Sequence, residues 1–235
     1  MRKNLFIVLV CFLLASSAFA QKSKPWSEWS KKDADKVLND SAWAQSITKG
    51  EAPVSMSRDA NEGRMGGAAA PSSNAPITEF NFRIRFLSAK PIREGFARRI
   101  VLSQPEKASE LTPQLQGIVD KGFGDYIVVA VNVEGQDPRT VNGLLQGLSR
   151  LTTAMLADKA YLERKDGKKS ALLEYRPPIA DGMGGKFIFA RTIDGAPFLA
   201  SDSDFVRFVL NVSDKMKLDV KFKVSGMMYG DKLEY

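Results

Sequence analysis

At residues 80–86 the chain reads Phe-Asn-Phe-Arg-Ile-Arg-Phe, with a large apolar residue at every second position. Strict alternation of this kind predicts a β-strand with one face in the core and the other toward water. A helix start follows at 88–91, with Ile92, Phe96 and Ile100 on one helical face. This strand leads directly into a helix, so the sequence predicts a mixed α and β fold.

Toward the C-terminus, helices come first and strands follow. One helix is expected to start at Thr112-Pro113 and end at Gly122, and another to start at Asp137-Pro138 and extend to Met155. Strands are expected at 125–133, 186–192, 205–212 and 218–224, although 205–212 also fits a helix. The predicted fold class is therefore α+β, with helices followed by a largely antiparallel sheet, in a single domain over 77–235.

A hairpin is expected around Asp166-Gly167, a pair that is typical of two-residue turns. In that register Arg164 faces Lys169 and Leu162 faces Ala171. Ala171 would then lie on the same face as Leu162, with Leu173 beside it.

Residues 21–48 are predicted to form a short, Trp-rich helical segment. Ser30 is the expected N-cap, with acidic Asp33 in the first turn. The three Trp residues, at positions 26, 29 and 43, can bind sugars or a partner, or can dock the segment onto the main domain. Docking is favoured, because buried aromatic side chains commonly anchor short elements. Residues 49–76 are rich in Gly, Ala, Pro and Ser, and they predict a disordered linker.

The first twenty residues have the pattern of a secretory signal peptide. Arg2 and Lys3 precede an apolar run over 5–14, and Ala18-Phe19-Ala20 supplies a cleavage site before Gln21. Ten apolar residues are too few for a transmembrane helix, which needs about 20. We therefore expect cleavage after Ala20, export to the periplasm or the extracellular medium, and no transmembrane segment afterwards. Losing Arg2 and Lys3 lowers the formal net charge from +7 to +5, which is too mild to indicate nucleic acid as a partner.

The composition excludes several kinds of chemistry. The chain has no His, and its one Cys, Cys11, lies in the predicted signal peptide. A Ser-His-Asp triad, a Cys-His pair, a His-based zinc site and disulfides are therefore ruled out for the mature chain. We expect no cofactor and no metal, since the Ser-Asp run at 201–204 lacks the pattern of a calcium loop and 181–186 lacks that of a phosphate loop.

Without His or Cys, acid–base catalysis would have to use Asp, Glu, Lys or Tyr. The candidate loop acids, which sequence alone cannot place relative to one another, are Asp181, Asp194, Asp202 and Asp204. Asp is common beside Gly or Ser because it forms turns, so turn formation is the favoured interpretation of all four.

A basic run is the surface feature with the clearest possible binding role. Its cations, which stand against the single acid Glu94, are Arg83, Arg85, Lys90, Arg93, Arg98 and Arg99. Arg83 and Arg85 share the polar face of their strand. Such a face can attract an anionic envelope component or a protein partner, whereas the alternative is an ordinary solvated surface.

Both ends of the mature chain and its first long strand carry a resemblance. The N-terminal Lys-Pro-Trp-Ser-Glu-Trp-Ser-Lys-Lys-Asp-Ala of 24–34, the Asn-Asp-Ser-Ala-Trp-Ala-Gln of 39–45, the strand and helix start at 81–91, and the ending at 228–235 are similar to a family of exported bacterial proteins with no known activity. The resemblance implies a bacterial, exported setting and carries no catalytic residue.

Taken together, the sequence favours a non-enzymatic exported envelope protein with a binding or structural role. The alternative is a carboxylate-dependent hydrolase that acts on an envelope polymer. The two differ in an observable way: a hydrolase needs two acids facing each other in a concave site, at least one with a shifted pKa.

Overall fold

The computed structural model describes residues 24–51, 78–214 and 216–235. The predicted signal peptide and residues 52–76 of the predicted linker lie outside these ranges. The predicted α+β class is confirmed: within the described ranges, five α-helices accompany an eight-stranded antiparallel sheet.

The sheet has the strand order β1-β2-β3-β6-β5-β4-β9-β10, so its two edges come from the two ends of the described chain. Its strands are β1 (Ala44–Glu51), β2 (Thr78–Phe86), β3 (Tyr126–Gly135), β4 (Ala160–Arg164), β5 (Lys169–Arg176), β6 (Gly185–Ala190), β9 (Phe205–Asn211) and β10 (Lys217–Lys223). Two small hairpins are separate from it, β7 (Thr192–Ile193) with β8 (Ala196–Pro197), and β11 (Met228–Tyr229) with β12 (Lys232–Leu233).

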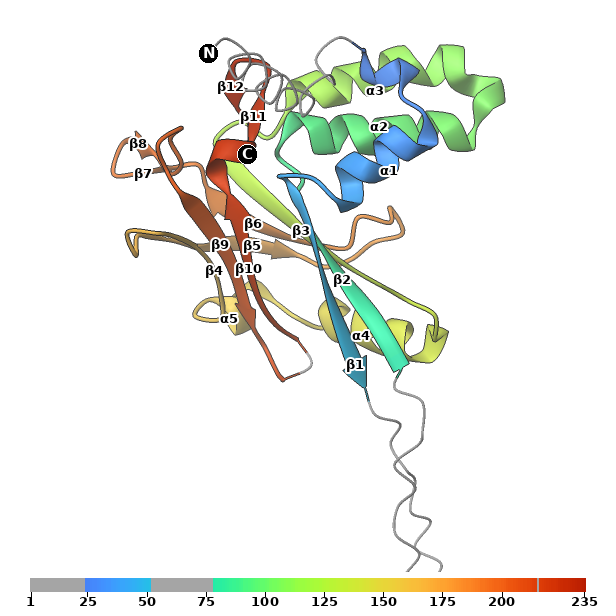
Figure 1. Cartoon of the computed structure of the whole chain (residues 1–235). Helices are drawn as coiled ribbons and strands as arrows, with labels where there is room; N and C mark the ends of the chain where they lie inside the picture. Colours follow the sequence, from blue (N-terminus) through green and yellow to red (C-terminus); the bar gives the residue numbers. More distant parts are fainter. Residues whose placement is uncertain (1–23, 52–77, 215) are drawn as a thin grey trace, which may run out of the picture.

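The helices lie at two ends of the sheet (Figure 1). At one end are α1 (Lys31–Asn39), α2 (Lys90–Ser103) and α3 (Ala108–Lys121), and at the other are α4 (Pro138–Ser149) and α5 (Thr153–Leu156). Short 3₁₀ turns occur at Trp26–Glu28, Pro105–Lys107 and Val224–Gly226.

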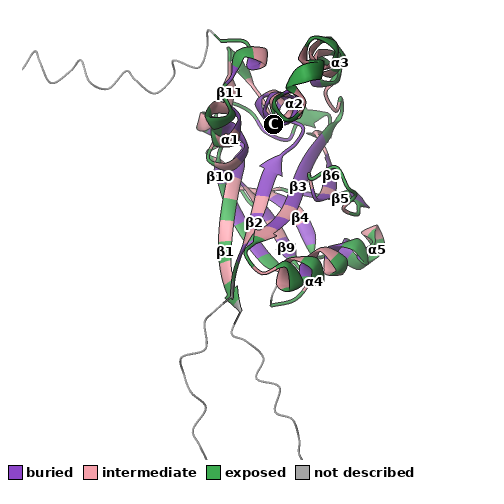
Figure 2. Ribbon diagram, turned by 90° about the vertical axis from the view of Figure 1, so that its right-hand side faces the viewer, coloured by how far each residue is buried: buried purple, intermediate pink, exposed green. Residues whose placement is uncertain are grey.

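The sheet curls around its core, so that its edges approach each other. The Phe86 ring of β2 lies 4.9 Å from the Phe222 ring of β10, although five strands lie between these two in the sheet order. Lys49 of β1 donates to the carbonyl oxygen of Lys217 in β10 at 2.8 Å. The enclosed face is the most deeply buried part of the molecule (Figure 2), with Phe82, Ile84 and Phe86 fully buried. We call this the inner face, and the opposite one the outer face.

The N-terminal segment belongs to the folded body. Trp26, Trp29 and Trp43 are all buried, so docking rather than an exposed sugar-binding role accounts for them. The capping box of α1 is present: the Ser30 side chain accepts from the Asp33 backbone, and the Asp33 side chain accepts from the Ser30 backbone. The predicted helical and linker boundaries are wrong over 44–51, however, because these residues form β1 along the edge of β2. The sequence of this segment has only a weak strand pattern, so its extended conformation is determined by pairing with β2 rather than by local preference.

Two helix predictions need correction. The second helix begins at Ala108, not at Thr112, because a 3₁₀ turn leads into it and Pro113 is accommodated inside it. The helix capped by Asp137 ends at Ser149, and the Thr152 side chain caps the separate α5 by accepting from the Met155 backbone. Residues 205–212 contain strand β9, so the helical alternative is excluded.

The predicted hairpin register is wrong by one residue. Leu162 faces Ser170 and Tyr161 faces Ala171, because the loop has three residues rather than two. Arg164 and Lys168 close it, and Gly167 takes a positive φ of 81°, as in a three-residue turn. The slip exchanges the two faces of β5, so Leu173 is 51% exposed instead of buried.

Candidate functional site

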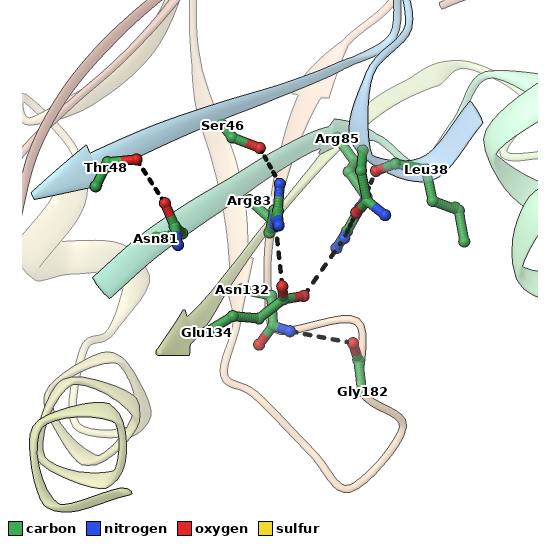
Figure 3. Close-up of polar contacts among 10 residues, drawn as sticks. Leu38, Ser46, Thr48, Asn81, Arg83, Arg85, Asn132, Glu134 and Gly182 are labelled. Carbon is green, nitrogen blue, oxygen red and sulfur yellow. Dashed lines mark hydrogen bonds and ion pairs between the residues drawn. The ribbon is translucent and has the colours of Figure 1, made fainter. Parts of the chain in front are cut away.

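The loop between β5 and β6 forms one wall of the candidate site. Asp181 organises it, since its carboxylate accepts from the Met183 backbone at 2.9 Å and from Lys186 Nζ at 2.7 Å. Gly182 accepts through its carbonyl oxygen from the Asn132 amide of β3. Gly184, at a φ of 89°, lies directly against the backbone of Val131. These contacts hold the loop on the outer face of the sheet (Figure 3).

Helices α1 and α2 form the other walls. They pack closely because Gly95 of α2 has no side chain where Leu38 of α1 lies; an added Cβ would be 2.9 Å from Leu38 Cγ. Phe96, one residue later, has its ring centroid 5.6 Å from the guanidinium of Arg85 in β2. The two helices are therefore packed on each other and against Arg85 on the outer face of β2.

A pocket of about 380 Å³ lies between these three segments, and we call it the helix–loop pocket. Its lining residues are Lys31, Asp35, Phe96, Arg99, Ile100, Leu102, Ser103, Asp181, Gly182 and Met183. The charged side chains are largely paired: Lys31 contacts Asp35 at 2.7 Å, and Asp181 contacts Lys186 at 2.7 Å. Arg99 is exposed and has no hydrogen-bond or ion-pair partner among the described residues.

Arg83 and Arg85 share the polar face of β2, as expected, but they do not form an open basic surface. Arg83 pairs with Glu134 of β3 at 3.0 Å and is partly exposed. Arg85 is only 1% exposed; it donates to the Leu38 carbonyl oxygen at 2.6 Å and to Asn39 Oδ1 at 2.9 Å (Figure 3). Burial lowers the pKa of Arg85 to about 10, although the carboxylate of Glu134 opposes this shift. Arg85 therefore fastens the end of α1 to the sheet.

Three further members of the predicted basic set also bind groups of the protein itself. Lys90 pairs with Asp120 of α3 at 3.0 Å. Arg93 donates to the Val119 carbonyl oxygen at 2.9 Å and also to that of Ser88, and burial lowers its pKa. Arg98 donates to the Trp29 carbonyl oxygen. Thus the six predicted residues do not converge on one surface, and of these only Arg99 lines the helix–loop pocket.

The four candidate acids lie in three places, and Asp202 and Asp204 share one of them. Asp181 lines the helix–loop pocket, and Asp194 pairs with Lys168 at 2.8 Å in the turn between β7 and β8. Asp202 and Asp204 line a second pocket of about 500 Å³ beside the β4–β5 turn. There the hydrogen bond from Lys165, at 2.6 Å, lowers the pKa of Asp204, which favours its ionised form. Within the described ranges, no three His, Cys, Asp or Glu residues are placed to hold a metal ion.

A shifted carboxyl group does occur elsewhere, at Glu94 of α2. Burial raises its pKa, and the hydrogen bond that Tyr229 donates at 2.5 Å partly offsets this rise. Glu94 is 5% exposed and lines neither of the two pockets described above. Its environment is that of a buried structural group rather than of a general acid open to substrate.

Sequence reasoning singled out Arg99 and Asp181 for different reasons, but it did not place them in one pocket or identify the other lining residues. The walls come from residues 31–35, 96–103 and 181–183, which are distant in the chain. Gly184 could have been noticed, because its neighbours Gly182 and Gly185 make a tight backbone approach plausible. The residues next to Arg85 in the sequence do not indicate that it is buried, because the element that covers it, α1, lies elsewhere in the chain.

Comparison with known proteins adds no identity. No protein-family model matches the chain, and no curated protein does. A solved structure of a protein of unknown function from Burkholderia pseudomallei is 9% identical, with a TM-score of 0.38, over 60% of this chain and 72% of that chain. A likeness at that level carries no argument. No helix in the described part of the chain is long and apolar enough to cross a membrane.

Proposed function

We propose that this protein is an exported, non-enzymatic binding protein and that the helix–loop pocket is its ligand-binding site. The observation that carries the proposal is Arg99, a cation without an ion-pair partner among the described residues, in the lining of a pocket. A charged ligand group that replaces water at such a side chain forms charge-assisted hydrogen bonds.

The lining also supports a ligand with an apolar part. Phe96, Ile100 and Met183 contribute apolar surface beside Arg99, and Leu102 is 36% exposed. Covering these side chains would contribute about 25 cal/mol for each Å² removed from water. The ligand class is therefore an anion that carries a hydrocarbon or aromatic group.

The alternative, a carboxylate-dependent hydrolase, has weaker support. The carboxylates of Asp181 and Asp204 are each paired with a lysine, at 2.7 and 2.6 Å. The hydrogen bond from Lys165 lowers the pKa of Asp204, whereas a general acid near neutral pH needs a raised pKa. The raised pKa of Glu94 belongs to a buried group outside both pockets.

Calorimetric titration with decanoate and with anilinonaphthalene sulfonate tests the binding site. We expect both amphipathic anions to bind, and Arg99→Gln to weaken their binding about tenfold, since a hydrogen bond to a charged group contributes about 1.5–3 kcal/mol. Arg139→Gln is the matched control, because Arg139 is an exposed arginine on α4 at the opposite end of the sheet. Absence of binding to the wild type, or equal affinities for R99Q and R139Q, would overturn the proposed site.

Export is tested separately, by measuring whether the predicted signal peptide is removed. The basic start, the apolar run and the Ala18-Phe19-Ala20 site support cleavage before Gln21. Mass spectrometry of protein recovered from a secreting bacterial host should give an N-terminus at Gln21. An intact chain beginning at Met1 and retained in the cell would contradict export.

A further inference from the structure

Half of the sheet leaves its outer face open. In β9 and β10 every second residue is buried, and the residues between them are half-buried or exposed. The buried members, such as Phe208 and Phe222, point to the inner face. We define the open face by the outward residues of β4, β5, β9 and β10, which include Tyr161, Glu163, Lys169, Phe205, Arg207, Val209, Lys217, Asp219, Lys221 and Lys223.

A row of charged side chains crosses this face from strand to strand. Glu163 of β4 faces Lys169 of β5 on one side and Arg207 of β9 on the other. Arg207 in turn faces Lys221 of β10. With adjacent strands about 4.8 Å apart, the row is about 14 Å long.

Positive charge is in excess on the open face. Its six cations stand against three carboxylates: Arg207 binds Glu163 and Asp219, and Arg176 of β5 pairs with Glu174. Lys169 lies 3.8 Å from Glu163. Lys217, Lys221 and Lys223 have no ion-pair partner among the described residues, so their fields add at the surface.

Aromatic rings hold two of these lysines against the sheet. Lys169 Nζ lies 4.3 Å from the ring centroid of Tyr161, and Lys221 Nζ lies 4.1 Å from that of Phe205. A cation over a ring is attracted by its quadrupole, at about 0.5–1 kcal/mol for an exposed pair. Ordering the ammonium groups in advance lowers the entropy cost of binding an anion.

Protection of a sheet edge does not account for the whole pattern. Lysines on an edge strand commonly prevent pairing with another chain, and β10 is an edge strand. Lys169 and Arg207, however, lie on β5 and β9, which are paired on both sides. Both are paired with carboxylates of the same face, and they extend the row of cations from the edge strand β10 into the middle of the sheet.

We propose that the open face binds a linear acidic polysaccharide, whose charged groups contact the cations across the strands. A membrane surface fits less well, because peripheral binding requires several apolar side chains that enter the lipid. Here lysines lie over Tyr161 and Phe205, and the large apolar side chain exposed on β5 is Leu173. Single-stranded nucleic acid fits less well for a related reason, since bases stack on free aromatic rings. This surface shares no residue with the helix–loop pocket, so the two proposals fail or stand independently.

The test is titration of the mature protein with polygalacturonate oligosaccharides at low and high salt. We expect binding that weakens as salt rises, and amide chemical-shift changes confined to β4, β5, β9 and β10. The triple variant Lys169→Gln, Lys221→Gln, Lys223→Gln should bind at least about tenfold more weakly at low salt. The control Lys32→Gln, Lys107→Gln, Lys121→Gln removes the same charge from exposed positions outside the sheet and should bind as the wild type does.

Each other result overturns the proposal. Equal weakening by the control triple would mean that net charge alone attracts the polymer. Tighter, lysine-dependent binding to phosphatidylglycerol vesicles or to a single-stranded oligonucleotide would assign the face to those partners. Absence of wild-type binding, or shift changes elsewhere on the protein, would show that the open face is only solvated. Arg99→Gln should leave polysaccharide binding unchanged.

Discussion

Gly184 lies so close to β3 that no side chain fits there. A Cβ on this residue would be 2.1 Å from the Val131 carbonyl oxygen, and its φ is 89°. Gly184→Ala is therefore expected to destabilise the protein by about 3 kcal/mol or more, since steric overlap adds to backbone strain. Gly182→Ala is the control, because Gly182 also has a positive φ of 70° but has no atom within 4 Å of the added Cβ; it should cost about 1 kcal/mol. Urea unfolding of both variants measures the difference, and equal losses would contradict the close approach.

Glu94 makes stability depend on pH. Burial raises its pKa above the ordinary value, against the effects of Tyr229, Lys90 and Arg93, while the negative charge of Asp120 adds to the rise. The folded state therefore holds this proton more tightly than the unfolded state. The stabilisation is fully present below the unfolded pKa and is lost as pH rises through the folded pKa.

The variant Glu94→Gln removes this titration while keeping an oxygen that can accept from Tyr229. Its stability relative to the wild type should therefore increase as pH rises from about 4.5 to about 7. Urea unfolding across this range gives the difference between the two proteins at each pH. A difference independent of pH would contradict the assignment to Glu94. Glu106→Gln, at an exposed position, should change stability by less than about 0.5 kcal/mol.

Individual caps were predictable, whereas the environment of Arg85 was not. Ser30 and Asp137 cap helices as their sequences indicate, because a cap depends on residues within one turn. Alternation along β2 correctly placed the side chains of Arg85 and Ile84 on opposite faces of the strand. It also predicts that the polar face is exposed to water. Here α1 covers that face, and Arg85 binds the Leu38 carbonyl oxygen. Burial of this kind depends on a contact between residues 47 positions apart.

At the level of elements, Arg85 joins α1 to the sheet. Arg85→Met should destabilise the protein by about 2–3 kcal/mol, because it leaves the Leu38 carbonyl oxygen buried without this donor. Hydrogen exchange should speed up most in α1 and least in α4. Arg83→Met is the control on the same strand: Arg83 pairs with Glu134 near the surface, and its loss should cost less than about 1 kcal/mol. Equal effects from both variants would show that Arg85 does not fasten α1.

The β4–β5 hairpin shows why an element can be right and its register wrong. Asp166-Gly167 does mark the turn, but the Asp166 carboxylate accepts from the Lys168 backbone at 3.2 Å and stabilises a three-residue loop. Both loop lengths are compatible with the local sequence. Ser170 is buried and Ala171 exposed as a result, which hydropathy alone would not choose. Contacts with β6 and β9 on either side therefore select the register.

For the whole molecule, the fold class was predictable but the strand order was not. Alternation at 80–86 and 218–224 identifies strands locally. The neighbours β3 and β6 are separated in the chain by two helices and two strands, and no local pattern encodes such a pairing. The helix–loop pocket depends on that arrangement too, because Asn132 of β3 holds the loop through Gly182.

The predicted domain boundary near residue 77 also has a consequence for the whole molecule. The segment before it supplies three buried Trp side chains and the strand β1, so it should not separate from the body when the chain is cut. We expect protein cleaved at a specific protease site placed between residues 52 and 77 to remain one particle in native size-exclusion chromatography. The β1–β2 pairing and the Trp contacts hold the fragments together, and each large aromatic contributes burial of about 150–250 Å².

Trp26→Ala combined with Trp29→Ala should release the N-terminal fragment, or at least lower the urea concentration that separates it. The matched double variant Glu28→Ala, Lys32→Ala changes exposed neighbours and should leave the cleaved protein intact. Separation of unsubstituted fragments under native conditions would show that the body after residue 77 folds independently of the Trp-rich segment.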